Sequence, residues 1–532
     1  MSAAAIEVNE LSVAQGGTAE LDRLSFKLAA GETLSVLGDS ASGKDALLRV
    51  LGGFTARGDE ISGTIQYGEG PALPAAKRGK PPIRVVYLAG AAEAPLNPHA
   101  SVVSQLARVL ARRLGSPRAS ASEELRIALA RFAEAPAFTD LAKKPGALTA
   151  MQLSWALLAC AMAQGPDLLI ADHAFADLTP TSIRTLVAAL TAEQKRLGFS
   201  LIYAARGLKT AMHLKSRMIV LRQGRVIEDG AFDKLASGQS HAYTKTLFKA
   251  LPRPADAPPS RAATRGEPLL QVQALDLRPV KGSAAAGPRS RDGLSFELRR
   301  GASLALIGEE GSGRRALVRA LLGLERVAGG RVVMDQVDMS ILSAAMTSRL
   351  RRRIAFITGA DDALDPRMTL WDTVDEPLRA HLRLPREMVA GHRETALKRV
   401  GLASYDGRRA VASLSPFDKR RLQVARAIVG APFLAVIDEP LRGLDAFAQS
   451  ILTELLEDFR RQEGPAFLLI TADVGVAQAL AEDAMFFKDR KVVERGPLRE
   501  ILKNPKDEET RRMIDASLPG MDLPGGQTYK AP

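Results

Sequence analysis

The sequence contains a single cysteine, Cys160, in 532 residues. One thiol excludes a disulfide framework and a zinc site built from several cysteines. Long hydrophobic runs are also missing, since a run such as residues 433–437 (FLAVI) is far too short to span a bilayer. The N-terminal residues (MSAAAIEVNELSV) lack the basic and apolar regions of a signal peptide. We therefore expect a cytoplasmic protein without a membrane span of its own, which reaches a membrane only through a partner.

The charge balance is positive, with 73 basic and 60 acidic side chains and a formal net charge of +13. Such a balance favours anionic partners in general, among them lipid surfaces, nucleotides and nucleic acid. The length and the 46% hydrophobic content allow two to four domains with substantial cores. Composition alone therefore indicates a folded multidomain protein without identifying its partner.

The chain repeats itself. Residues 24–38 (LSFKLAAGETLSVLG) are matched by residues 294–308 (LSFELRRGASLALIG), an offset of 270. Further along, Asp172 ends the run LLIAD and Asp438 ends the run LAVID, an offset of 266. Two landmarks at nearly the same offset predict two homologous domains in tandem.

A segment rich in proline and alanine separates the two halves, and such a composition favours a stiff, extended connection. We accordingly predict a first domain over residues 1–251, a linker over 252–267, a second domain over 268–518 and a flexible tail over 519–532. In each half a wholly apolar strand leads into a glycine loop and a helix, predicted over residues 45–51 and 315–322. Wholly apolar strands indicate a parallel sheet buried on both faces, so each domain is predicted to be α/β.

The first glycine loop, GDSASGKD at residues 38–45, follows most of the phosphate-binding pattern G-x-x-x-x-G-K-[ST]. In that pattern backbone N–H groups surround the phosphates and the lysine reaches them as well. Asp45 replaces the hydroxyl residue; its carboxylate is able to hold magnesium but also repels phosphate. The predicted nucleotide-binding residues here are Gly38, Ser42, Gly43, Lys44 and Asp45.

The second loop, GEEGSGRR at residues 308–315, keeps the glycines but has Arg314 for the lysine and Arg315 for the hydroxyl residue. Planar guanidinium groups replace neither a lysine's fit nor a hydroxyl's bond to magnesium, and Arg315 places its charge where the metal belongs. The candidate nucleotide-binding residues of this half are Gly308, Gly311, Ser312, Gly313, Arg314 and Arg315.

Both strand-ending aspartates, Asp172 and Asp438, are candidate magnesium ligands of Walker B type. Glu439 follows the second one and is the candidate catalytic base. His173 occupies the corresponding place in the first half, where it is a possible substitute base.

With these motifs in place, the chain resembles a tandem ATP-binding subunit of an ABC transporter, in the branch that imports oligopeptides, dipeptides or nickel. The tail motif HAYT at residues 241–244 is similar to the tail of that branch. The segments LNP at 96–98 and LDPRMT at 364–369 resemble its segment that meets the transmembrane partner. The resemblance implies two tandem P-loop NTPase domains of ABC type, each with a helical subdomain, at roughly residues 100–150 and 370–415. It implies ATP and Mg²⁺ as cofactors, and ABC permease subunits and a solute-binding protein as partners. It also implies a peripheral position on the cytoplasmic face of the inner membrane, and no nucleic acid is expected.

The chain departs from the family pattern at nearly every catalytic position. Where the family has LSGGQ, this chain has LTAMQ at residues 148–152 and LSPFD at 414–418, which add bulk and remove a backbone donor. The glutamine that couples nucleotide to permease aligns with Gly90 and Thr358, and the switch histidine with Arg206 and Ala472. The aromatic residue that stacks on adenine aligns with Gln15 and Pro279.

Three hypotheses follow. The first is the ATP-binding subunit of a peptide-type importer, with eroded ATP hydrolysis. The second is a pseudo-ATPase that acts outside transport as a nucleotide-binding scaffold or regulator. The third is the translation-factor branch of ABC proteins. It is disfavoured because that branch has a long charged helical linker, whereas the linker of this chain is short and rich in proline and alanine.

Overall fold

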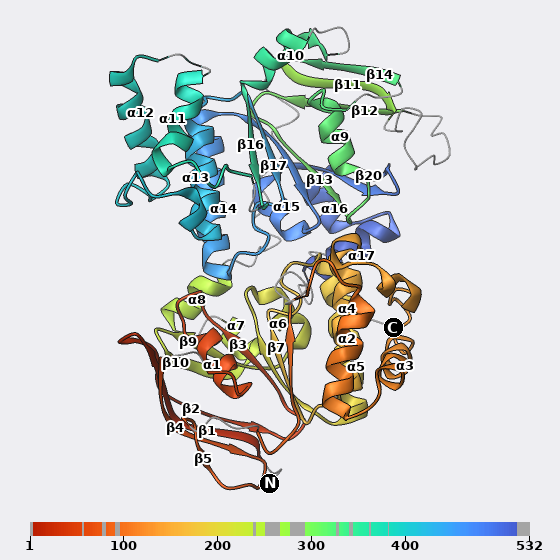
Figure 1. Cartoon of the computed structure of the whole chain (residues 1–532). Coiled ribbons are helices and arrows are strands. Elements are labelled where there is room, and N and C mark those ends of the chain that lie inside the picture. The colour runs from red at the N-terminus through yellow and green to blue at the C-terminus, as the bar shows by residue number, and fades with distance from the viewer. Residues whose placement is uncertain are drawn as a thin grey trace. The chain divides into compact units, whose positions relative to one another are not determined.

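The computed structural model describes residues 4–518, apart from 56–57, 77–80, 91–95, 238–240, 250–266, 277–292, 326–328, 340–343, 361–362, 381 and 383. The chain forms two compact units, the first reaching residue 250 and the second beginning at residue 251 (Figure 1). The tail predicted for residues 519–532, and all of the predicted linker but Glu267, lie outside the described residues. The predicted domain boundaries therefore remain predictions.

The first unit contains two sheets. An antiparallel sheet has the order β2-β1-β4-β5, and a larger sheet has the order β10-β9-β3-β8-β7-β6. The strands of the first sheet are β1 (Ala4–Gln15), β2 (Thr18–Ala29), β4 (Asp59–Tyr67) and β5 (Leu73–Pro74). Those of the second are β3 (Thr33–Leu37), β6 (Val85–Ala89), β7 (Leu168–Asp172), β8 (Ser200–Ala204), β9 (Arg217–Arg222) and β10 (Arg225–Ala231).

The larger sheet is parallel except for its edge strand β10, which pairs antiparallel with β9. Its central strand β8 is buried along its whole length, and β3 and β7 nearly so. Strands covered on both faces carry apolar side chains on both, which is why they read as continuous apolar runs. The α/β prediction is confirmed for this unit.

Helices pack on both faces of this sheet. Helix α1 lies with the antiparallel sheet in one hydrophobic core, together with side chains from β3, β7, β8 and β9. Figure 1 shows α2, α4 and α5 gathered on the other side, and the predicted helical subdomain begins there with α2. The helices are α1 (Lys44–Leu51), α2 (Val102–Leu114), α3 (Arg118–Leu129), α4 (Ala150–Ala163), α5 (Pro180–Leu197), α6 (Leu208–Leu214), α7 (Phe232–Ala236) and α8 (Ala242–Lys249).

The second unit repeats this architecture. Its sheets have the orders β12-β11-β14-β15 and β16-β17-β18-β13-β19-β20, the latter matching the larger sheet of the first unit strand for strand. The strands are β11 (Pro268–Asp276), β12 (Leu294–Arg299), β13 (Ser303–Gly308), β14 (Gly329–Met334), β15 (Val337–Asp338), β16 (Ile354–Thr358), β17 (Leu434–Asp438), β18 (Ala466–Thr471), β19 (Asp483–Lys488) and β20 (Lys491–Pro497).

Helix α9 takes the place of α1, and a second core joins the other face of the sheet to the helical segment. In Figure 1 that segment, α11 to α13, stands beside β16. It begins where the helical subdomain was predicted. The helices are α9 (Arg314–Leu321), α10 (Ala344–Arg351), α11 (Leu370–Ala380), α12 (Arg386–Arg399), α13 (Pro416–Val429), α14 (Ala446–Glu463), α15 (Val474–Leu480), α16 (Leu498–Lys503) and α17 (Glu508–Ser517).

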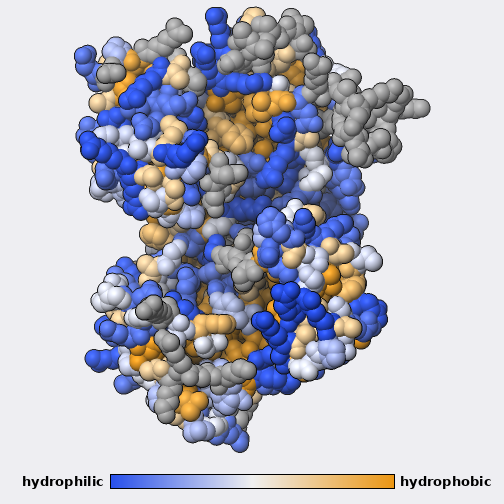
Figure 2. Space-filling model, viewed as in Figure 1, coloured by the Kyte–Doolittle hydropathy of each residue, from blue (hydrophilic) through white to orange (hydrophobic). Residues whose placement is uncertain are grey.

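The surface is mixed in polarity. Figure 2 shows hydrophobic side chains exposed in the second unit near β16, where Phe356 is 47% exposed. Phe356 lines a hollow of about 160 Å³ together with Leu364 and Pro377. Across the described ranges, no helix is both long enough and apolar enough to cross a bilayer.

Candidate functional site

The predicted site residues of each unit meet at one edge of the larger sheet. In the first unit the glycine loop follows β3, Asp172 ends β7, and Arg206 comes two residues after β8. The carboxyl ends of adjacent parallel strands lie together, and an open α/β sheet binds its ligand at that edge. Chain segments far apart in sequence therefore bring their polar side chains to one place.

The first glycine loop has the shape of a phosphate cradle. Gly43 has φ +90°, and a Cβ atom there would lie 2.2 Å from the carbonyl oxygen of Glu20. Ser42 Oγ donates to the carbonyl oxygen of Asp39 at 2.7 Å, and the buried Lys44 Nζ donates to the same oxygen at 2.8 Å. Burial lowers the pKa of the Lys44 ammonium. The lysine is thus held inside its own loop, where it donates to one carbonyl oxygen.

We predict that Gly43→Ala destabilises the protein by more than about 1 kcal/mol, because alanine disfavours a positive φ and its methyl group would overlap Glu20. Thermal unfolding followed by circular dichroism would measure this. Gly58→Ala is the matched control, since Gly58 also has a positive φ but a Cβ atom there would have nothing within 4 Å. Equal losses for the two variants would show that the close approach to Glu20 does not matter.

Next to the loop, two carboxylates surround a buried imidazole. His173 Nε2 lies 3.6 Å from Asp45 Oδ1 and 3.6 Å from Asp172 Oδ1. The His173 side chain is 6% exposed, whereas that of Asp45 is 66% exposed. Interaction with the imidazole, and the charges of Lys44 and Arg206, lower the pKa of the Asp45 carboxyl. The side chains of Asp45, Asp172 and His173 therefore form one polar cluster that opens to solvent at Asp45.

Tyr87 of β6 completes this cluster. Its hydroxyl donates to Asp172 Oδ2. Burial and this contact with a carboxylate raise the pKa of the phenol, so it stays a donor at neutral pH. Sequence reasoning missed Tyr87. A signal was present, because Tyr87 and Phe356 occupy equivalent positions of β6 and β16, and a partly buried tyrosine hydroxyl needs a partner that a phenylalanine does not.

In the second unit, Arg314 and Arg315 stand at the positions of Lys44 and Asp45. Arg315 Nε donates to Asp438 Oδ2 at 2.9 Å, and its Nη2 donates to Oδ1 at 3.4 Å. Arg314 is buried, donates to the carbonyl oxygen of Glu309 at 3.2 Å, and has its pKa lowered by burial. The guanidinium of Arg315 thus lies against the carboxylate that was expected to hold Mg²⁺.

The candidate base Glu439 has several donors of its own. Its Oε1 accepts from the backbone N–H of Ala472 at 2.7 Å, and its Oε2 accepts from Thr471 Oγ1 at 3.0 Å. Arg314 Nη1 also lies 3.5 Å from Oε1. Thr471 was not anticipated. The Glu439 carboxylate is therefore already engaged by three donors of its own unit.

His173 and Glu439 share an unusual backbone. Both have positive φ, +46° and +47°, in the left-handed region that residues other than glycine rarely adopt. Each also donates its N–H to the neighbouring strand, at Ala204 and Ile470 respectively. The two residues are therefore structurally equivalent, as are Arg206 and Ala472, each of which comes two residues after the acceptor, Ala204 or Ile470. A shared strained backbone at corresponding places is typical of functional positions.

The two residues aligned with the family's coupling glutamine are not equivalent to each other. Thr358 pairs with Asp438, whereas Ala89 pairs with Asp172. The counterpart of Gly90 is therefore Gly359, and the ungapped alignment was wrong by one residue in one half. The reason is that counting in sequence cannot detect a one-residue difference in strand register, which hydrogen bonding settles.

The segments that replace LSGGQ act as helix caps. Thr149 and Gln152 form a reciprocal capping box at the start of α4. Ser415 caps α13, and the Oγ of Ser415 accepts from the N–H of Asp418 at 3.1 Å. Pro416 takes the first helical position. Proline suits the first helical position because no N–H is needed there. These residues therefore satisfy the helix ends locally.

The tail motif contacts the first glycine loop. Tyr243 of α8 donates from its hydroxyl to Asp39 Oδ2 at 2.9 Å and accepts from the Asp39 N–H at 3.0 Å. Burial raises the pKa of this phenol. Of the two residues aligned with the family's adenine platform, Gln15 is exposed at the end of β1 and Pro279 lies outside the described residues.

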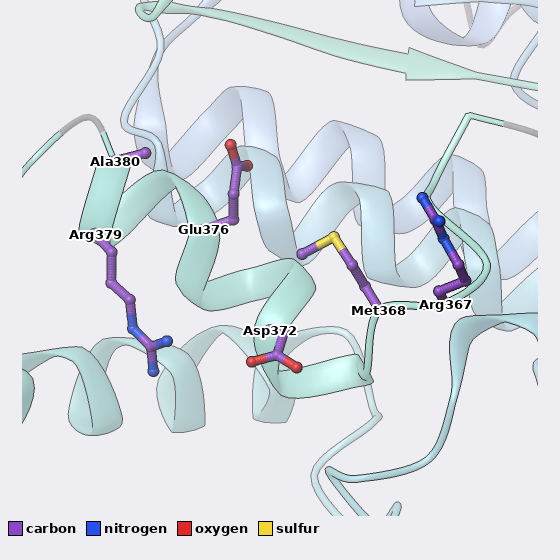
Figure 3. A pocket seen from close by; sticks show the side chains of 6 residues that line it. All are labelled: Arg367, Met368, Asp372, Glu376, Arg379 and Ala380. Atoms are coloured by element: carbon purple, nitrogen blue, oxygen red, sulfur yellow. The ribbon is translucent and has the colours of Figure 1, made fainter.

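The predicted permease-facing segment of the second unit borders an open hollow of about 620 Å³. Arg367 and Met368 come from the loop and the other side chains from α11 (Figure 3). Thr369 starts that helix by accepting from the Asp372 N–H at 3.1 Å. The residues that line the hollow are Arg367, Met368, Asp372, Glu376, Arg379 and Ala380. In the first unit, Asn97 and His99 of the corresponding segment are exposed.

The strand, glycine loop and helix, with an aspartate at the end of the next strand but one in the same sheet, define both units as P-loop NTPase domains. The family model for ABC transporters matches residues 21–176 and 291–442. These matches cover more than half of the chain, so the chain belongs to the ABC transporter family, as a tandem two-domain member. Domains of this family bind ATP, typically with Mg²⁺.

The chain is similar to the glutathione import ATP-binding protein GsiA of Escherichia coli (strain K12). It is 29% identical to that protein and the match covers 96% of this chain and 89% of the relative. The same figures hold for GsiA of Shigella sonnei (strain Ss046). Among solved structures, cbiO1 from Clostridium perfringens, part of the ABC transporter complex cbiONQ, matches with a TM-score of 0.40 and 22% identity, over 48% of this chain and 96% of that one.

Proposed function

We propose that this protein is the ATP-binding subunit of a peptide-type ABC importer, in which the first unit binds nucleotide and hydrolysis is eroded in both units. One observation carries the proposal: Arg314 and Arg315 contact Glu439 and Asp438 in the second unit, whereas Lys44 of the first unit donates to a carbonyl oxygen of its own loop. The first unit fits ATP with Mg²⁺ through Lys44 and Asp172. The second does not fit the metal, because a guanidinium already neutralises its carboxylate.

The importer assignment is supported by the tandem arrangement and by relatives whose name includes glutathione import. A subunit of this kind works with permease subunits in the membrane and with a solute-binding protein, and it lies peripherally on the cytoplasmic face of the inner membrane. The hollow at α11 offers both signs of charge. The hollow with Phe356 adjoins the same segment through Leu364 and combines apolar side chains with arginines such as Arg426. This combination suits a partner loop with an apolar centre and a polar rim.

The alternative is a pseudo-ATPase that acts outside transport, as a nucleotide-binding scaffold or regulator. The loss of a paired lysine and base favours it, since neither unit keeps both.

Co-expression with permease and solute-binding-protein genes found beside the gene for this chain would test the importer role. We expect permease subunits to co-purify with the full-length chain and uptake of small peptides to be lost on its deletion. Arg367→Glu should weaken co-purification, because Arg367 is 89% exposed at the hollow. Arg461→Glu, on α14 and 71% exposed, is the matched control and should leave it unchanged. Uptake that continues without the chain, and no permease association, would favour the scaffold.

A further inference from the structure

We propose that Asp45, Asp172 and His173 form a site for one divalent transition-metal ion of zinc type, which fills without any nucleotide. The family's usual metal position relies on a hydroxyl side chain and on phosphate oxygens. Here an imidazole nitrogen and a second carboxylate stand beside the strand-ending aspartate instead. This inference does not depend on the role in import.

The geometry suits a small ion. One ligand atom from each of the three residues lies within 4.8 Å of the other two, and His173 Nε2 is 3.6 Å from an oxygen of each aspartate. A tetrahedral Zn²⁺ with bonds of about 2.0–2.2 Å keeps its ligand atoms roughly 3.3–3.6 Å apart. The side chains therefore need only small movements to close around an ion. The Asp45 side chain is 66% exposed, which gives the ion a way in.

His173 itself points to a ligand. Its side chain is 94% buried, with Nε2 aimed at the two carboxylates at distances too long for hydrogen bonds. Within the described part of the chain, its Nδ1 and Asp172 Oδ1 are buried without a hydrogen-bond partner. Burying polar atoms without partners costs free energy, and an ion bound by Nε2 and Oδ1 would offset part of that cost.

Tyr87 prepares the aspartate for this role. Its hydroxyl donates to Asp172 Oδ2, so the remaining oxygen, Oδ1, is the one that faces His173. Hydrogen bonds that fix the orientation of a ligand carboxylate are a regular feature of metal sites and contribute to affinity. Imidazole with carboxylates is a ligand set suited to Zn²⁺, while Mg²⁺ prefers oxygen ligands alone.

The second unit provides an internal comparison. There Arg315 takes the position of Asp45, and its guanidinium donates to Asp438. The guanidinium charge of Arg315 balances the Asp438 carboxylate, as the proposed metal ion would balance Asp172 in the first unit. The two units therefore satisfy the same strand-ending aspartate in different ways, and only the first needs a metal to do so.

The test uses the full-length chain, stripped of metal by a chelator and titrated with Co²⁺ in the absence of nucleotide. We expect the visible absorption bands of tetrahedral Co²⁺ at one equivalent per chain, abolished by competing Zn²⁺. His173→Gln and Asp45→Ser should each weaken binding by more than the roughly 10–100-fold that loss of an outer partner costs, and Tyr87→Phe by about that amount. His392→Ala, which removes an exposed histidine of the second unit, should leave binding unchanged.

Asp45 is exposed, so Asp45→Ser should fold even if His173→Gln does not, and circular dichroism would verify both. Three results would overturn the proposal: no Co²⁺ bands without ATP, binding that survives Asp45→Ser, or binding that is lost in His392→Ala. Loss of peptide uptake or permease association bears on the importer role alone, so the two proposals fail separately.

Discussion

Purified full-length protein is expected to release no phosphate from ATP and Mg²⁺ above the level of a Lys44→Ala/Glu439→Gln double variant. The reason is that neither unit holds both the loop lysine and the base. The first has Lys44 but carries His173 and Arg206 where the family has glutamate and histidine. Loss of a positioned base costs about 10²–10⁴ in rate, and loss of a preorganised donor costs roughly 10²–10³. Such losses are not additive, so the expectation is a severe defect without a product of factors.

The contacts of the second unit deepen this defect. Glu439 is the right residue type for a base, but it accepts hydrogen bonds from Thr471 and Ala472 and lies 3.5 Å from Arg314. Both carboxylate oxygens are therefore already engaged within the unit, whereas a base needs an oxygen within reach of the water that it deprotonates. Arg315 also forms an ion pair with Asp438, the candidate magnesium ligand of this unit.

Phosphate release should also be measured with any permease subunits that co-purify with the chain. Phosphate release would still occur if His173 acted as a substitute base, because an imidazole is able to accept a proton. Robust turnover that the double variant abolishes would contradict the expectation. Turnover lost specifically in His173→Gln would identify the histidine as the substitute base.

Labelled ATP is expected to bind at the first unit in preference to the second. Lys44 is a compact ammonium whose only loop partner in the described structure is the carbonyl oxygen of Asp39, which a phosphate oxygen can replace. In the second loop Arg314 is buried against Glu439, and Arg315 pairs with Asp438. A nucleotide would have to break these contacts before it could enter, which costs affinity.

Equilibrium binding of labelled ATP to single variants would measure this order. Lys44→Ala should remove most of the binding, whereas Arg314→Gln should leave it within a few fold of the parent. Arg314→Gln is preferred to alanine because it keeps part of the buried volume, and thermal unfolding would verify that both variants are folded. Binding that survives Lys44→Ala but disappears with Arg314→Gln would reverse the order.

Much of the fold could be predicted from patterns in the sequence. The repeat, the apolar strands and the glycine loops predicted two α/β units, and helices α1 and α9 begin within one residue of the predicted positions. Strand register did not follow, because hydrogen bonding between strands is not written in residue counts. That is why Gly90 and Thr358 were matched although Gly359 is the true counterpart of Gly90.

The candidate site could be predicted from the sequence only in part. Local motifs located the loops and the strand-ending aspartates, since their spacing is set by one strand, one loop and one helix. Tyr87 and Thr471 could not be found in the same way. Their roles depend on which neighbouring strand lies beside Asp172 or Glu439, and those strands are distant in sequence.

The sequence alone determined which chemical groups are available: one loop lysine, one candidate base in the other half, and no hydroxyl after either loop. Side-chain type is a local property, so folding cannot add a lost group. Only the tertiary structure decided what those groups contact. It placed Arg315 on Asp438, and it placed Asp45 with His173 and Asp172, because the carboxyl ends of parallel strands bring distant residues to the same edge of the sheet.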